Sequence, residues 1–114
     1  MRYRNPNSSD QGEVSLESAR KLRAEGNYEA TMDLLDKLIE SCEQDPRLYA
    51  HRGYTHQEVG QYQAAIADYD KAIQLKKDVP TTFYMRARAK EELGDLEGAL
   101  ADYRESARLK FDKA

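Results

Sequence analysis

The chain has 114 residues, the length of one domain, of which 34% are charged and 39% hydrophobic. With 3 prolines and 6 glycines it is neither collagen-like nor proline-rich, and its hydrophobic content predicts a folded domain. The net charge of −3 argues against nucleic-acid binding, and no apolar run approaches the roughly 20 residues of a membrane span. The chain start lacks the apolar core of a signal peptide, and a single cysteine, Cys42, excludes an internal disulfide. We therefore expect a cytoplasmic protein that binds neither nucleic acid nor a membrane.

A repeated pattern follows a short leader. Residues 1–11 are rich in Asn, Ser and Asp, which predicts a disordered leader. Beyond it, Gly26, Gly60 and Gly94 stand 34 residues apart, and each is followed by a polar residue. The flanking positions also agree in chemical character, although the first copy is the most diverged. The pattern predicts three tandem repeats, which span 12–45, 46–79 and 80–113.

Each copy is predicted to form two antiparallel helices. In the second copy, Asp45 and Pro46 are typical of a helix start, and Gly60 permits the positive φ at which the chain turns back. Within residues 62–75, apolar side chains recur every three or four residues, which places them on one stripe of a second helix. Small residues occupy the positions where two helices would cross closely: Ala19, Gly53 and Ala87 in the first helices, and Thr31, Ala65 and Ala99 in the second helices.

The sequence shows no pattern of catalytic or metal-binding residues. It contains no glycine-rich phosphate loop, cysteine pair or nucleophile elbow. Its two histidines, His51 and His56, are five residues apart, a spacing that separates them around a helix. We expect no enzymatic activity, no metal and no cofactor. His56 is expected to pack between helices, and Cys42 to lie on or near the surface without a redox role.

Two charged pairs recur at one spacing. Arg52 and Asp68 lie sixteen residues apart, and Arg86 and Asp102 repeat the pair in the next copy. The first copy has neither residue type at these positions. Because the two residues are gained and lost together, the pattern predicts an ion pair between the two helices of a copy, with a shared contact to a partner as the alternative. A partly exposed pair of this kind contributes about 0 to 1 kcal/mol.

The pattern resembles the tetratricopeptide repeat, a family of 34-residue antiparallel helix pairs. The resemblance rests on residues 60–73, which match the family's second-helix signature, and on Tyr49 and Gly53, which match the bulky and small positions of its first helix. Ser15 departs from the bulky position in the first copy. The resemblance implies an all-α fold: a right-handed α-solenoid of three antiparallel helix pairs over residues 12–114, with a concave peptide-binding groove.

The resemblance also implies which residues line the groove. Arg20, Tyr54 and Arg88 form a stripe across the three copies, and two guanidiniums beside a phenol would pair with acidic groups of a ligand. We therefore expect a protein or peptide partner with acidic groups, with a solvated wall that has no dedicated ligand as the alternative. The candidate groove residues are Arg20, Arg23, Arg47, His51, Tyr54, Tyr84, Met85 and Arg88, with Leu16, Glu17, Ala50, Gln57 and Glu91 beside them.

Two specialised functions of related repeats are not expected. Co-chaperones of this family clamp the C-terminal carboxylate of heat-shock proteins with Lys, Asn and Arg residues. At those positions this chain has Leu16, Arg20, His51, Thr81 and Met85, so it lacks the clamp. The pentatricopeptide family reads RNA, but its repeats have 35 residues and its groove is basic, whereas the first copy here is acidic.

Three functions remain open at this point. The chain is a non-catalytic adaptor or scaffold, a dedicated chaperone or immunity partner of one secreted or toxic protein, or a self-associating structural module. The third copy bears on self-association, because the sequence stops where a further helix would cover its apolar stripe. Tyr103, Leu109 and Phe111 are therefore expected to form an exposed apolar end that contacts a second copy or a partner.

Overall fold

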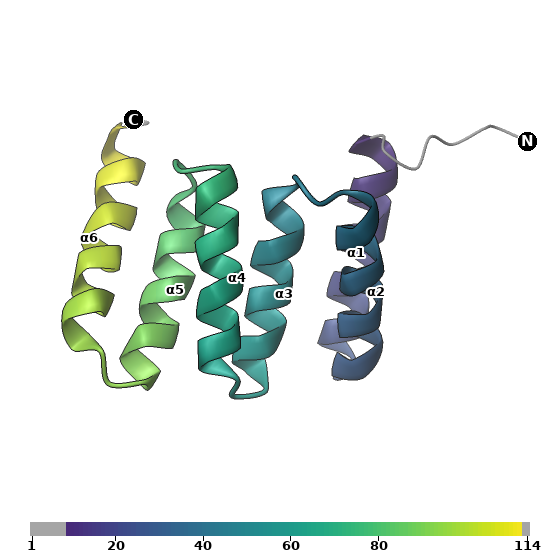
Figure 1. Cartoon of the computed structure of the whole chain (residues 1–114), viewed down its shortest axis with the longest axis horizontal. Coiled ribbons are helices and arrows are strands. Elements are labelled where there is room, and N and C mark those ends of the chain that lie inside the picture. Colours follow the sequence, from purple (N-terminus) through teal and green to yellow (C-terminus); the bar gives the residue numbers. More distant parts are fainter. Residues whose placement is uncertain (1–8, 113–114) are drawn as a thin grey trace, which may run out of the picture.

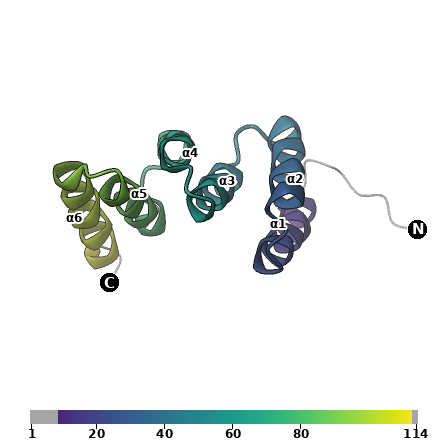
Figure 2. The same ribbon diagram turned by 90° about the horizontal axis from the view of Figure 1, so that it is seen from below.

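Six helices stand side by side in a row in the computed structural model, which describes residues 9–112 (Figure 1). Viewed along their axes, successive helices follow a zigzag from α1 to α6 (Figure 2). The three helix pairs coincide with the three predicted copies, so the fold is an all-α solenoid of helix pairs, as expected. The helices are α1 (Ser9–Ala24), α2 (Tyr28–Ser41), α3 (Pro46–Glu58), α4 (Tyr62–Leu75), α5 (Pro80–Glu92) and α6 (Leu96–Asp112).

The first helix begins earlier than the sequence pattern predicts. Residues 9–11, which were assigned to the leader, belong to α1, and residues 1–8 of that leader lie outside the described residues. Ser and Asp are residue types that favour the N-terminus of a helix, which accounts for a start at Ser9. The helix therefore starts three residues before the predicted boundary at residue 12.

A glycine turn joins the two helices of each pair. Gly26, Gly60 and Gly94 have φ angles of +80°, +81° and +84°. This left-handed conformation is strained for residues with a Cβ atom, so glycine is required at the end of each first helix. In the first pair the side chain of Asn27 then accepts a hydrogen bond from the backbone N–H of Ala30 at 3.3 Å, which caps α2. The 34-residue spacing of glycine and polar residue thus reflects a repeated turn.

Small side chains let the paired helices approach closely. A Cβ atom on Gly53 would lie 2.9 Å from Cε1 of Tyr69 and 3.1 Å from the carbonyl oxygen of Ala65, so a larger residue would push α3 and α4 apart. The predicted crossing positions are confirmed, since all of them are buried: Ala19, Thr31, Gly53, Ala65, Ala87 and Ala99.

An apolar cluster joins α1 to α2 and α3. It contains Leu16, Leu35 and Leu48, with Cys42 partly buried against them. The expectation that Leu16 lines the groove is wrong, because its side chain is only 4% exposed. An aliphatic side chain at the junction of three helices gains more from burial than from facing water.

The predicted ion pairs are present in both later copies. Arg52 donates to both carboxylate oxygens of Asp68, at 2.9 and 2.8 Å, and Arg86 donates to both oxygens of Asp102, each at 2.7 Å. Such bidentate pairing fixes the orientation of the two helices. Each arginine also donates to an aspartate on the preceding second helix, a contact that the sequence pattern did not predict: Asp36 for Arg52 at 3.1 Å, and Asp70 for Arg86 at 2.7 Å.

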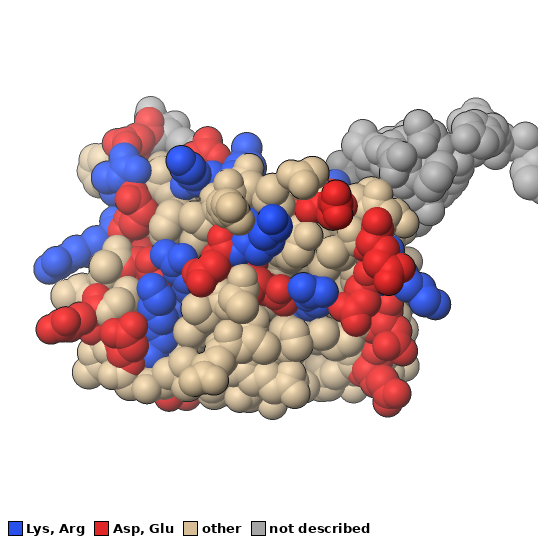
Figure 3. Space-filling view, in the orientation of Figure 1, with Lys and Arg blue, Asp and Glu red and all other residues tan. Residues whose placement is uncertain are grey.

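Charged side chains are unevenly spread over the face shown in Figure 3. Acidic side chains gather over α2, acidic and basic side chains lie side by side toward α6, and the lower middle of this face carries few charges. The exposed acids of α2 are Glu29, Asp33, Asp36 and Glu40. Within the described residues, no helix is long and apolar enough to span a bilayer.

Candidate functional site

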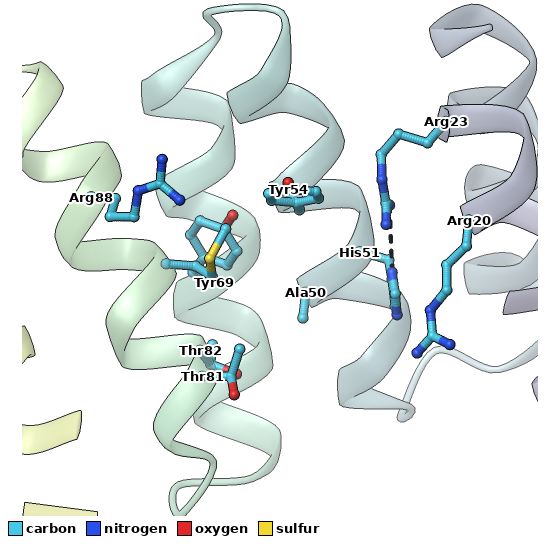
Figure 4. Close-up of a pocket in the computed structure, with 10 residues that line it drawn as sticks. Arg20, Arg23, Ala50, His51, Tyr54, Tyr69, Thr81, Thr82 and Arg88 are labelled. Atoms are coloured by element: carbon cyan, nitrogen blue, oxygen red, sulfur yellow. Dashed lines mark hydrogen bonds between the residues drawn. The ribbon is translucent and has the colours of Figure 1, made fainter. Parts of the chain in front are cut away.

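A central hollow of about 380 Å³ lies between α1, α3 and α5, the first helices of the three pairs. Figure 4 shows the side chains that converge on it. Of the eight candidate groove residues, all except Arg47 and Tyr84 line this hollow, and of the residues expected beside them only Ala50 does. The lining residues are Arg20 and Arg23 from α1, Ala50, His51 and Tyr54 from α3, Tyr69 from α4, and Thr81, Thr82, Met85 and Arg88 from α5.

Arg23 is held within the protein. Its guanidinium lies 4.7 Å from the ring centroid of Tyr54, its Nη1 lies 3.5 Å from Nδ1 of His51, and its Nε lies 3.6 Å from a carboxylate oxygen of Glu58. The Arg23 side chain is only 12% exposed. Arg23 therefore joins α1 to α3 and has little charge left to offer a ligand.

His51 is a neutral group on the wall of the central hollow. Burial of the ring, followed by repulsion from Arg23, Arg20 and Arg47, lowers the pKa of His51 from 6.5 to about 4, although Asp45 opposes the shift. At neutral pH the imidazole therefore carries no charge. A ligand carboxylate beside this ring would stabilise the protonated form and raise its pKa.

Arg20 and Arg88 supply the available positive charge. Both side chains are exposed, and both line the hollow, from α1 and α5 respectively. Among the described residues, no carboxylate forms an ion pair with either guanidinium. Two unpaired guanidiniums on opposite walls of one hollow attract an anionic group between them.

The floor of the hollow comes from a second helix, which the sequence analysis did not predict. Tyr69 of α4 is 1% exposed and donates a hydrogen bond from its hydroxyl to Oε1 of Gln57 at 2.7 Å. Burial raises the pKa of Tyr69, so the hydroxyl stays protonated. The resemblance places groove residues on first helices alone, whereas Tyr69 belongs to the apolar stripe predicted within residues 62–75. The bulky Tyr69 opposite Gly53 is the signal that could have indicated this floor.

Two further hollows continue the central one along α3 and α5. The apolar hollow, of about 430 Å³, lies at the start of these helices and shares Ala50 and His51 with the central hollow. The acidic hollow, of about 270 Å³, lies at their ends and shares Tyr54 and Arg88 with it. We call the three hollows together the groove. Arg47 lines the apolar hollow, and so belongs to the groove away from its centre.

Tyr84 lies apart from the central hollow. Its ring packs edge-to-face against Tyr103 of α6, with centroids 5.6 Å apart, and the Nζ of Lys110 lies 5.9 Å from its centroid. Tyr103 donates a hydrogen bond to Glu91 at 2.7 Å, which raises the pKa of the Tyr103 hydroxyl to about 12. Tyr84 and Tyr103 thus form an aromatic contact between α5 and α6.

The exposed apolar end differs from the prediction. Phe111 is 84% exposed, as expected, but Leu109 is only 7% exposed and belongs to the core. Ser106 is also buried, and its hydroxyl donates to the carbonyl oxygen of Pro80 at 2.9 Å. The exposed apolar residues of α6 include Leu96, Leu100, Ala107 and Phe111, because the helix turns Leu109 toward α5.

The two histidines have separate environments. His51 faces the central hollow, whereas His56 is partly buried, with Nδ1 2.7 Å from Oε1 of Gln61 and Nε2 3.7 Å from Asp68. His56 therefore packs between α3 and α4, as predicted. Within residues 9–112, no three His, Cys, Asp or Glu side chains are grouped so that they could hold a metal ion.

The chain belongs to the tetratricopeptide repeat family. Two profiles of that family, both described as tetratricopeptide repeat, match residues 46–79 and 80–113. The matches have the boundaries predicted for the second and third copies, and α1 and α2 add a further helix pair in the same arrangement. No curated protein matches the chain.

Solved structures share the fold. The second tetratricopeptide domain of Spaghetti (RPAP3), bound to the HSP90 peptide SRMEEVD, has a TM-score of 0.80 and 24% identity, over 84% of this chain and 89% of that one. The type III secretion chaperone SycD of Yersinia enterocolitica, in complex with a peptide of the translocator YopD, has a TM-score of 0.83 and 25% identity, over 92% and 80%. PcrH, in complex with the chaperone-binding region of PopD, has a TM-score of 0.82 and 22% identity, over 90% and 77%.

Proposed function

We propose that this tetratricopeptide repeat protein is a non-catalytic adaptor that holds an acidic segment of a partner protein in its groove. The observation that carries the proposal is the pair of unpaired guanidiniums, Arg20 and Arg88, on opposite walls of the central hollow. Within the described residues, neither guanidinium forms an ion pair, whereas Arg23 is paired with Glu58. Two cations left exposed beside a neutral histidine indicate a site for carboxylates.

The chemistry of the hollow suits a protein segment. Tyr54 and Met85 offer aromatic and aliphatic surface beside the arginines, and such mixed surfaces are typical of protein interfaces. The structural relatives named above were solved with bound peptides, which supports a peptide ligand here. The chain lacks the clamp for a C-terminal carboxylate, so the ligand is proposed to bind through acidic side chains.

The test is a comparison of binding by three forms of the protein. The three forms are the wild type, the groove variant Arg20→Glu/Arg88→Glu and the control variant Lys37→Glu/Arg104→Glu. The control makes the same change in net charge as the groove variant, but at exposed sites outside the groove. Each form is immobilised and exposed to extract of the source cell, and retained proteins are purified for calorimetry. We expect the groove variant alone to weaken binding, by about 2 kcal/mol or more. Equal binding by all three forms would contradict the proposal.

The number of partners separates an adaptor from a dedicated chaperone or immunity protein. Several groove-dependent partners support an adaptor, whereas one stoichiometric partner supports the dedicated function. Both functions use the groove, so the groove variant reduces binding in either case.

Self-association is the second candidate function. Leu96, Leu100 and Phe111 are 65%, 49% and 84% exposed along one helix, and an apolar stripe of this kind favours contact with another surface. Leu100→Glu/Phe111→Lys should make the protein monomeric in sedimentation equilibrium if the stripe pairs two copies. A wild type that remains monomeric at high concentration would exclude this function.

A further inference from the structure

We propose that the groove selects an ordered segment, in which an acidic block lies between an apolar block and a basic block. The inference rests on the proposed function, because it requires a peptide in the groove. It adds that the three hollows along α3 and α5 differ in chemistry. A ligand that fills the whole groove must match all three in their spatial order.

The hollows form one continuous path. The apolar hollow and the central hollow share Ala50, His51, Thr81 and Thr82, and the central and acidic hollows share Tyr54 and Arg88. The path follows α3, whose 13 residues make it about 20 Å long. About six extended residues span that length, so each hollow accommodates about two residues of an extended ligand.

The first hollow has little net charge. Its two cations are each compensated by an aspartate nearby: Arg47 lies 2.8 Å from Asp45, and Lys76 lies 3.6 Å from Asp78. Besides the neutral ring of His51, the remaining lining is carbon surface from Pro46, Ala50, Val79 and the threonine methyl groups. With its charges compensated, this hollow favours an apolar side chain.

The last hollow is acidic. Glu58, Glu91 and Glu92 line it, against the single cation Arg88, which it shares with the central hollow. Glu58 is partly compensated by Arg23 at 3.6 Å, but the hydrogen bond from Tyr103 leaves the charge of Glu91 in place. The hollow also lies at the C-terminal ends of α3 and α5, where the helix dipoles add partial negative charge. It therefore favours a basic side chain.

The central hollow has the opposite sign. Arg20 and Arg88 carry uncompensated positive charge there, and His51 is neutral. A basic residue in the central hollow would meet like charges, and an acidic residue in the last hollow would meet three carboxylates. Repulsion on both sides makes the order of the blocks matter as much as their composition.

The order is tested with three labelled peptides of identical composition. Each has two leucines, two glutamates and two lysines in blocks, flanked by Gly-Ser, with the glutamates, the lysines or the leucines in the middle. Placing a block in the middle tests the order without specifying which way the peptide runs. We expect the peptide with central glutamates to bind about tenfold more tightly in fluorescence anisotropy. Equal affinities, or a preference for another middle block, would overturn the inference.

A second arm tests the acidic hollow directly. Glu91→Gln/Glu92→Gln removes two charges and keeps an acceptor for Tyr103, and the control Asp33→Asn/Glu40→Gln makes the same charge change on α2, outside all three hollows. Glu91→Gln/Glu92→Gln should lower the affinity for the preferred peptide several-fold. It should leave unchanged the affinity for a peptide whose lysines are replaced by serine. The same loss with both peptides would overturn the assignment of this hollow.

The outcomes separate this inference from the proposed function. If all three peptides bind equally and Arg20→Glu/Arg88→Glu weakens each of them, the groove binds acidic segments and the order is wrong. If that variant changes none of the affinities, both the order and the groove function are wrong.

Discussion

The helices of the first pair are held together by different interactions from those in the two later pairs. In the later pairs, Arg52 and Arg86 each bind an aspartate of their own pair with two hydrogen bonds and reach a second aspartate on the preceding pair. The first pair has Ser18 and Leu34 at the corresponding positions, and Leu34 packs against the leucine cluster. Directional hydrogen bonds fix the angle between helices, whereas apolar burial stabilises contact between helices without fixing that angle.

This difference bears on the groove, because α1 supplies Arg20 and Arg23. The wall that carries Arg20, one of the two arginines proposed to bind the ligand, is thus held to α2 by leucines, and to α3 partly by Arg23. The opposite wall, α5, is fixed to α6 by the pair of Arg86 and Asp102. Variants at each junction test whether the two kinds of contact differ as described.

The leucine cluster of the first pair should be the most sensitive junction. Leu35 is fully buried between α1, α2 and α3, and Leu35→Ala would remove contacts and leave a cavity. We expect the free energy of unfolding in urea to fall by about 2 to 5 kcal/mol. Leu93→Ala, at an exposed site outside the groove and the α6 stripe, is the control and should change it little. Equal small effects of the two variants would show that leucine burial does not hold the first pair.

The ion pair of the third copy should respond differently to single and double replacement. The Asp102 side chain is 6% exposed; burial would raise its pKa, but hydrogen bonds from Arg86 and Lys90 lower it overall. Asp102→Ala would leave both cations without this acceptor and should lower the free energy of unfolding by about 3 kcal/mol. Arg86→Met/Asp102→Leu removes both charges and should recover most of the loss. A double variant as unstable as the single one would contradict this account.

The junction between the first two pairs should depend on pH. Because the pKa of His51 is about 4 in the folded protein and 6.5 in the unfolded chain, only the unfolded chain gains this proton between these values. Stability should therefore fall as the pH drops from 6.5 to 4, by about 2 kcal/mol after allowance for partial exposure of the ring. His51→Gln should lack this contribution. Identical pH profiles of the two proteins in urea unfolding would show that His51 is not a buried neutral group.

The smallest expected loss of stability is at Ser106, which links α6 to the start of α5. Its hydroxyl donates to the carbonyl oxygen of Pro80, where the second pair has Ala72. Ser106→Ala should lower the free energy of unfolding by about 1 kcal/mol. A thermal melt unchanged from wild type would mean that the alanine serves as well in the third pair as it does in the second.

The repeat pattern predicts contacts within one helix pair well. The glycine turns, the small residues at helix crossings and the pairing of Arg52 with Asp68 follow from spacing, because each depends on residues of one copy. The additional acceptor Asp36 was missed because it lies on the preceding copy. A repeat alignment places a residue on a helix face but does not show how far the neighbouring pair covers that face.

The groove was predictable in outline from the resemblance to the repeat family. That resemblance implied that Arg20, Tyr54 and Arg88 lie on the inner wall, but it gave no sign that Arg23 is held by Glu58. It also placed Leu16 on the wall and Leu109 at the surface, although neighbouring helices bury both. Burial depends on three helices meeting, and the pattern of a single copy does not contain that information.

The pKa of His51 tests the central claim most directly, because its ring lies between the helices that supply Arg20 and Arg88. The side-chain signals of His51 are followed by NMR as the pH is changed. The titration is done with and without a saturating amount of the peptide that has glutamates in the middle, and the signals of His56, which lies outside the groove, are recorded for comparison. We expect a pKa of about 4 for His51 in the free protein and a higher pKa in the complex, where ligand carboxylates stabilise the imidazolium. A His51 titration unchanged by bound peptide would show that the ligand's acidic groups do not occupy the central hollow.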